Sequence, residues 1–66
     1  MQIQLGIIGY GGMGKWHAEN APRAGVEITA VCDIVKERRE EAKEQGYRAY
    51  DSAEELLKDE EVNTVI

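Results

Sequence analysis

A glycine-rich motif and one aspartate are the residues of this chain whose types and spacing could do chemistry. Residues 9–14 read Gly-Tyr-Gly-Gly-Met-Gly, which fits the pattern G-x-G-x-x-G, and they directly follow the apolar run 3–8. Asp33 comes 19 positions after the last of these glycines, at the end of a second apolar run, 26–32. A glycine loop that joins a strand to a helix and precedes an acidic residue at this distance is typical of dinucleotide binding. The motif therefore predicts a site for the diphosphate and ribose of such a cofactor.

The residues of the motif have different physical roles in this hypothesis. Gly9 lets the chain leave the strand in a tight turn, and the missing Cβ of Gly11 lets a diphosphate approach the backbone. Gly14 permits close packing of the helix on the strand. A helix that starts near Gly12 and Met13 has unpaired N–H groups in its first turn, and these groups point toward the phosphates.

The carboxylate of Asp33 predicts which dinucleotide is preferred. It would accept hydrogen bonds from both hydroxyls of the adenosine ribose, and it would repel a phosphate on the 2′ position. We therefore expect NAD to be preferred over NADP.

We interpret most other side chains near the motif as structural. Lys15 does not belong to a P-loop, because that motif requires Ser or Thr at the next position and this chain has Trp16. We expect Trp16 to lie in an interface or in the core, His17 to be a packed, hydrogen-bonded neutral side chain, and Cys32 to be a buried core residue. The side chain of Tyr10 is expected to flank the cofactor or substrate cleft.

The elements that must position these residues alternate between strand and helix. Strands are predicted at 3–8, 26–32, 48–50 and 62–66, and helices at 13–21, at 35–45 and from 51–52 onward. Right-handed crossovers then predict a doubly wound parallel sheet with strand order 3-2-1-4, with the first two helices on one face and the third on the other. The fold class is therefore α/β, a partial Rossmann fold truncated after its fourth strand.

Two details of the helices are also predicted. The small residues Gly14, Ala18 and Ala21 form a stripe that lets the first helix lie close to the strands. In the third helix, Ser52 and Glu55 match a capping box, and Leu56 and Leu57 are expected to supply its buried face.

Composition excludes several classes of function. The 66 residues include 13 acidic and 8 basic side chains, for a net charge of −5, which argues against binding to nucleic acid or to an anionic membrane. Six of the acids lie within 51–61, and we interpret that stretch as a solvated surface and not as a metal site. The chain has one cysteine and no recognisable signal peptide or membrane span, so the cytoplasm is the expected compartment.

The chain resembles the N-terminal domain of the Gfo/Idh/MocA family of NAD(P)-dependent oxidoreductases. The resemblance rests on the glycine motif 9–14, on His17-Ala18 and on Val31-Cys32-Asp33, and it continues through 50–57 and 62–66. It implies that residues 1–66 are the N-terminal part of a dinucleotide-binding domain, with the rest of that domain and a substrate domain absent from this chain. The open apolar edge that the fourth strand would leave supports the same expectation.

The resemblance also assigns candidate residues to the two parts of the cofactor site. The diphosphate would be held by the loop formed by Gly9, Tyr10, Gly11, Gly12 and Met13, mainly through backbone N–H groups.

The adenosine would be held by three further residues. Asp33 would bind the ribose, Ile34 would line the adenine pocket, and Arg38 would lie over the adenine or near the ribose. An arginine beside the ribose would weaken the preference set by Asp33, which leaves NADP as the alternative cofactor.

The resemblance implies an activity that residues 1–66 do not have alone. The family's general-acid lysine, in a Glu-Lys-Pro motif, lies beyond residue 66, so no residue here is assigned as catalytic. We expect the whole protein to be a homo-oligomer that transfers hydride between nicotinamide and a hydroxyl or carbonyl carbon of a sugar, inositol or similar polyol. Two alternatives stay open: an amino-acid dehydrogenase or dihydrodipicolinate-type reductase, and a non-catalytic NAD-sensing or scaffold protein.

Overall fold

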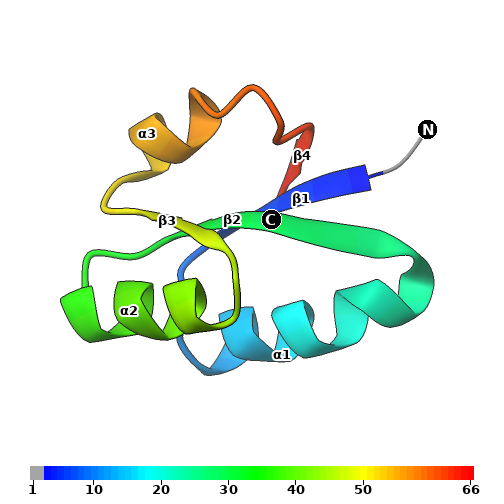
Figure 1. Cartoon of the computed structure of the whole chain (residues 1–66), viewed down its shortest axis with the longest axis horizontal. Helices are drawn as coiled ribbons and strands as arrows, with labels where there is room; N and C mark the ends of the chain where they lie inside the picture. The colour runs from blue at the N-terminus through cyan, green and yellow to red at the C-terminus, as the bar shows by residue number, and fades with distance from the viewer. Residues whose placement is uncertain (1–2) are drawn as a thin grey trace.

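The computed structural model describes residues 3–66, which form a parallel sheet with helices on both faces (Figure 1). The elements in chain order are β1 (Ile3–Ile8), α1 (Gly12–Asn20), the 3-10 turn η1 (Ala21–Ala24), β2 (Val26–Cys32), α2 (Lys36–Glu44), β3 (Arg48–Tyr50), α3 (Ala53–Leu57) and β4 (Thr64–Val65). The strand order is β3-β2-β1-β4, and all the pairs are parallel. Helices α1 and α2 lie on one side of the sheet and α3 on the other, so the predicted doubly wound arrangement is confirmed (Figure 1).

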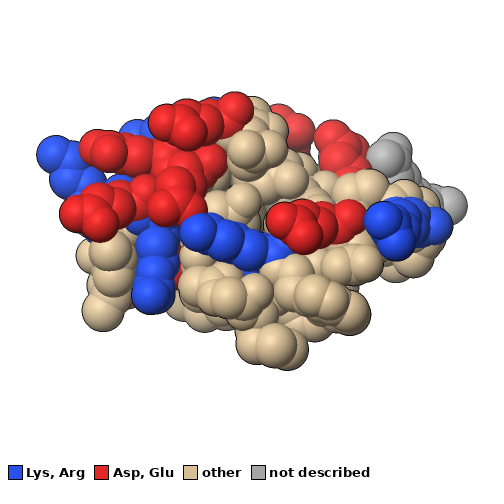
Figure 2. All heavy atoms as spheres, turned by 90° about the horizontal axis from the view of Figure 1, so that it is seen from below, with Lys and Arg blue, Asp and Glu red and all other residues tan. Residues whose placement is uncertain are grey.

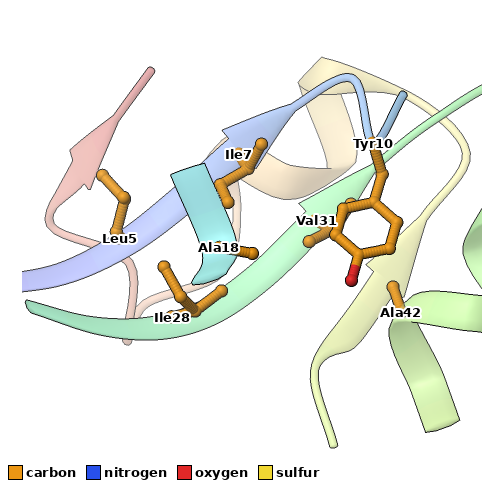
Figure 3. Close-up of a cluster of buried hydrophobic side chains, with 7 residues drawn as sticks. All are labelled: Leu5, Ile7, Tyr10, Ala18, Ile28, Val31 and Ala42. Carbon is orange, nitrogen blue, oxygen red and sulfur yellow. The ribbon is translucent and has the colours of Figure 1, made fainter. Parts of the chain in front are cut away.

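Two apolar cores hold the layers together, one on each face of the sheet. The first lies under α1 and α2, and its buried members are Leu5, Ile7, Tyr10, Ala18, Ile28, Val31 and Ala42 (Figure 3). The second lies under α3 and consists of Ala30, Cys32 and Leu56. Small alanine side chains stand in both cores: Ala18 and Ala42 in the first and Ala30 in the second.

The two helices of the first layer are also joined by charge. Lys15 of α1 forms an ion pair with Glu41 of α2. Figure 2, which views this layer from the helix side, shows acidic and basic side chains gathered next to one another over part of the surface, while much of the remaining face is uncharged. The mixture of signs is typical of a solvent-facing helix surface.

A bulge in β2 distributes its side chains between the two cores. Leu5 of β1 pairs with Ile28, but the next residue, Gly6, pairs with Ala30, which leaves Thr29 as an extra residue. In a regular strand Ile28 and Ala30 would face the same side. The bulge instead places Ile28 in the first core and Ala30 in the second. It also leaves the hydroxyl of Thr29 buried without a hydrogen-bond partner.

The third helix agrees with the sequence prediction only in part. The hydroxyl of Ser52 accepts a hydrogen bond from the Glu55 N–H at 3.1 Å, so the predicted N-cap is present. Leu56 is fully buried, but Leu57 is 62% exposed, and its predicted burial is wrong. Because α3 has only five residues and turns about 100° at each one, Leu56 faces the sheet and its neighbour points away from it.

The remaining differences concern the ends of elements. α1 runs from 12 to 20 instead of 13 to 21, α2 is one residue shorter at each end than predicted, and β4 contains only Thr64–Val65. Within the described range 3–66, no helix is long and apolar enough to cross a membrane. The same residues hold no group of three His, Cys, Asp or Glu side chains placed to bind a metal ion.

Candidate dinucleotide-binding site

The candidate site lies where the carboxyl ends of β1 and β2 meet. The N–H of Gly9 donates to the carbonyl oxygen of Cys32 at 2.8 Å, which fixes the start of the glycine loop beside the end of β2. Gly9 has a φ of 90°, in the left-handed region that only glycine adopts without strain. The strand order reverses at β1, which pairs with β2 on one side and β4 on the other, and ligands of open parallel sheets bind at such a switch point.

The first turn of α1 follows the loop without a gap. Gly14 is buried against the backbone of Gly9, where a side chain on Gly14 would overlap the carbonyl oxygen of Gly9. The helix begins at Gly12, and no side chain caps it at Gly11. Space around Gly12 is open, because a Cβ there would meet no atom within 4 Å. Helix α1 therefore offers uncapped N–H groups at an accessible surface, which is the arrangement that binds phosphate.

Asp33 is held in place by the backbone on both sides of its carboxylate. Oδ2 accepts a hydrogen bond from the Tyr10 N–H and Oδ1 accepts one from the Val35 N–H, both at 2.8 Å. Burial of this residue, which is 8% exposed, works against ionisation. The hydrogen bonds from Val35 and Tyr10, together with the charge of Arg38, outweigh that effect and hold the pKa of the Asp33 carboxyl below its usual range. The group is therefore an anion with fixed orientation.

Arg38 connects the two halves of the candidate site. Its Nη1 lies 3.6 Å from Oδ2 of Asp33. The same atom would lie 3.4 Å from a Cβ on Gly11, so the guanidinium rests against the glycine loop. A cation placed between this carboxylate and the glycine loop can pair with an anionic group of a ligand there.

Two further contacts that position Asp33 were not predicted. Arg39 donates from Nη1 to the carbonyl oxygens of Asp33 and Ile34, at 2.9 and 3.1 Å. The N–H of Asp33 donates to the carbonyl oxygen of Tyr50 at 3.0 Å. The sequence predicts neither contact. It does not indicate which of the adjacent residues Arg38 and Arg39 reaches back to Asp33, and a backbone hydrogen bond can be made by any residue type.

Surface hollows lie on both sides of the glycine loop and share Ile8 and Gly9. One is lined by the end of β2, by Arg38 and by the segment 51–53. The other is lined by residues of α1, including Met13 and His17, and by Ile66. A hollow on each side of the loop matches a ligand with two halves joined by a diphosphate.

Among the remaining residues near the motif, one side chain lies in the core and the others lie beside the two hollows. The ring of Tyr10 is buried in the first core, edge-on to Tyr47 at 6.3 Å, so it does not flank the cleft and only its backbone reaches the site (Figure 3). Ile34 and Met13 are 87% and 71% exposed beside the hollows. His17 is half-buried in the second hollow, with its ring edge-on to Trp16.

Trp16 and Cys32 differ in how well their positions agree with the sequence prediction. Trp16 is 56% exposed, so a core position for it is wrong. Cys32 is buried, as predicted, and burial raises the pKa of its thiol. The thiol is therefore protonated and serves as a small core side chain.

Known proteins are similar to this chain in sequence and in fold. The model of an oxidoreductase family with an NAD-binding Rossmann fold matches residues 3–66. Inositol 2-dehydrogenase from Salmonella typhimurium is 34% identical over 71 residues, a match that covers 100% of this chain and 21% of the relative. The chain thus spans about a fifth of that relative's length.

Solved structures agree with this match. An NAD-binding protein from Listeria innocua superposes with a TM-score of 0.89 at 44% identity, over 98% of this chain and 20% of that one. The protein GenD2 from gentamicin A biosynthesis, solved in complex with NAD, superposes with a TM-score of 0.85 at 27% identity, over 97% and 19% of the two chains. The chain belongs to the Gfo/Idh/MocA oxidoreductase family and forms part of its NAD-binding Rossmann domain.

Proposed function

We propose that the protein carrying this sequence is an NAD-dependent oxidoreductase in which residues 9–13, 33, 34 and 38 hold the adenosine and diphosphate of the cofactor. The observation that carries the proposal is the placement of Asp33. Its carboxylate is fixed by two backbone N–H groups at the end of β2, next to the uncapped start of α1. A carboxylate that can accept hydrogen bonds from a ribose and a set of N–H groups that can donate hydrogen bonds to phosphate therefore lie side by side.

The carboxylate of Asp33 keeps the capacity to bind a ribose. Each of its oxygens accepts one backbone hydrogen bond, and a carboxylate has about four acceptor positions in all. The unused positions can accept hydrogen bonds from the two ribose hydroxyls. The exposed side chain of Ile34 offers an apolar surface to the adenine, and Arg38 stands where it can reach the ribose or the diphosphate.

The diphosphate would lie against the backbone of Gly11, Gly12 and Met13. Two properties support this position: the open space at Gly12 and the absence of a side-chain cap at Gly11. The positive end of the α1 dipole adds to the attraction for phosphate. When bound, the cofactor supplies the hydride chemistry, and this part of the protein supplies its binding and orientation.

The proposed substrate of the whole protein is a sugar, inositol or similar polyol. The support is the match to inositol 2-dehydrogenase, together with membership of the family. Residues 1–66 form the N-terminal part of a dinucleotide-binding domain in this proposal and contain no catalytic residue. We therefore expect them to be inactive without the remaining part of that domain and a substrate domain.

Titration of the intact protein with NAD and NADP by calorimetry tests the cofactor site. Tighter binding of NAD supports the proposal, and binding of neither dinucleotide overturns it. A screen of inositols, sugars and amino acids, followed by the absorbance of reduced nicotinamide, then tests the substrate class. Turnover of amino acids alone would replace the polyol assignment with the amino-acid dehydrogenase alternative.

A further inference from the structure

A buried carboxylate outside the candidate site forms a small network of its own. Asp59 lies in the loop between α3 and β4, and its side chain is only 4% exposed. Oδ2 accepts a hydrogen bond from the hydroxyl of Tyr50 at 2.7 Å and faces Nε of Arg48 at 3.1 Å. Oδ1 accepts the N–H of Glu61 at 3.0 Å. Both oxygens of this carboxylate are therefore engaged.

The network is charged and remains so at neutral pH. The hydrogen bond from Tyr50 lowers the pKa of the Asp59 carboxyl, burial opposes this, and the Glu61 N–H and the Arg48 charge add to the lowering. The same hydrogen bond raises the pKa of the Tyr50 hydroxyl, which stays protonated and donates. Hydrogen bonds to a charged acceptor are shorter and stronger than those between neutral groups.

Tyr50 links this network to the candidate cofactor site. It is the last residue of β3, and its carbonyl oxygen accepts the N–H of Asp33 at 3.0 Å. The next three residues, 51–53, line the hollow beside Asp33 and Arg38. A single residue is thus held at its hydroxyl by Asp59 and at its backbone by Asp33.

The connection also crosses the whole sheet. β3 and β4 are the two edge strands, and the loop that contains Asp59 leads into β4. Asn63, at the end of that loop, donates its N–H to the carbonyl oxygen of Gln4 in β1 at 2.9 Å. The Asp59–Tyr50 bond therefore ties the loop that enters one edge strand to the end of the other.

We propose that Tyr50 and Asp59 are positioning residues for the adenosine half of the cofactor: their hydrogen bond fixes the end of β3 and thereby the backbone of Asp33 and the wall formed by residues 51–53. This inference rests on the function proposed above. It assigns to Asp59 a role in cofactor binding through other residues, without contact with the ligand.

A matched pair of tyrosine variants tests the proposal in the intact protein. Tyr50→Phe removes the hydroxyl bonded to Asp59, and Tyr47→Phe removes the hydroxyl of a tyrosine that packs against Tyr10 in the core on the other face of the sheet. The probes are AMP, for the hollow beside Asp33, and inorganic pyrophosphate, for the glycine loop. Loss of one charge-assisted hydrogen bond predicts that Tyr50→Phe raises the dissociation constant of AMP about fivefold. Tyr47→Phe is expected to leave it unchanged, and neither variant should alter pyrophosphate binding.

Variants of Asp59 provide a second readout that a general loss of stability would not give. In an Asp59→Ala background, Tyr50→Phe should cause no further loss of AMP affinity, because the bond is already absent. Asp59→Asn keeps an acceptor oxygen for the Tyr50 hydroxyl and should retain more AMP affinity than Asp59→Ala.

The possible outcomes separate this inference from the function on which it rests. Wild-type protein that binds neither AMP nor NAD overturns the proposed function. Wild-type protein that binds AMP while Tyr50→Phe binds it equally well overturns the positioning role alone. An equal loss of AMP and pyrophosphate affinity, or an equal loss in Tyr47→Phe, also overturns it, since either result would indicate a general structural effect.

Discussion

The carbonyl oxygen of Gly9 lies so close to the backbone of Gly14 that it would overlap a Cβ at that position, so the glycine loop and helix α1 touch backbone to backbone. The Cγ2 atom of Ile7 lies 3.4 Å from the same position, which closes the space from the strand side. Gly12, in the same motif, differs because its surroundings are open. The glycines of the motif thus serve separate needs: close packing at Gly14 and, in the proposed site, ligand access at Gly12.

Gly14→Ala should therefore destabilise the protein severely. The obstructing atom belongs to the backbone and not to a flexible side chain, so the helix itself must shift. We expect a loss of about 3 kcal/mol or more in the free energy of unfolding, measured by urea denaturation. Gly12→Ala is the control, because alanine there meets no atom and should not lower stability. Equal stability of the two variants would contradict the close approach of α1 to the loop.

Asp33→Ser is predicted to shift cofactor preference toward NADP. Serine removes the negative charge that would repel a 2′-phosphate and also one acceptor for the ribose hydroxyls. We expect the ratio of NAD to NADP affinity to fall about tenfold or more, which corresponds to about 1.4 kcal/mol. Calorimetric titration with both cofactors measures the ratio, and a thermal melt confirms that the variant is folded despite losing bonds to Tyr10 and Val35. An unchanged ratio would assign the discrimination to other residues.

Arg38→Ala should act on NADP more than on NAD. Arg38 is the cation next to Asp33, so it is placed to offset the repulsion of a 2′-phosphate. We expect the NADP affinity of the variant to fall about tenfold and the NAD affinity to change less. Lys36→Ala removes one positive charge from the same helix, at a position that pairs only weakly with Glu40, 4.0 Å away, and serves as the control. Equal effects of the two substitutions would mean that only the net charge of α2 matters.

The alternation of strands and helices allowed the strand order to be predicted, and the glycine motif with Asp33 allowed the edge of the sheet that carries the candidate site to be predicted. Both depend on local requirements, namely a tight turn after a strand, a right-handed crossover and an acid at the end of the next strand. The structure confirms the strand order and places the motif and Asp33 side by side at the switch point.

The features that were not predicted depend on contacts between distant residues. Asp59 is one of six acids in 51–61, and nothing in its neighbours distinguishes it from the exposed Glu60. Only the approach of Tyr50 and Arg48 makes it a buried hydrogen-bond acceptor. The bulge at Thr29 likewise follows from register with β1, and Tyr10 is buried because Tyr47 and Ala42 approach it from α2 and its following turn.

Leu56 and Leu57, which are adjacent in α3, allow the contribution of the second core to the free energy of unfolding to be measured. Leu56 is 0% exposed and packs near Gly6 of β1, whereas Leu57 is 62% exposed. Leu56→Ala should lower the free energy of unfolding by about 2–5 kcal/mol, because it removes buried methyl groups and leaves a cavity. Leu57→Ala should change it by less than about 0.5 kcal/mol. Urea denaturation of both variants measures the difference, and a comparable loss in each would contradict the packing of α3 on the sheet.

Acid should unfold the protein partly by protonating Asp59. Its folded pKa lies below the unfolded value of about 3.9, so its contribution to stability is complete above that pH and is lost as the pH falls through the lower, folded pKa. Asp59→Asn should therefore be less stable than wild type at pH 7, and the difference should shrink steadily below about pH 4. Urea midpoints measured between pH 7 and pH 2.5 test this, with Glu60→Gln, an exposed acid of the same loop, as the control. A difference between Asp59→Asn and wild type that stays constant with pH would show that packing, and not the ionised carboxylate, stabilises this loop.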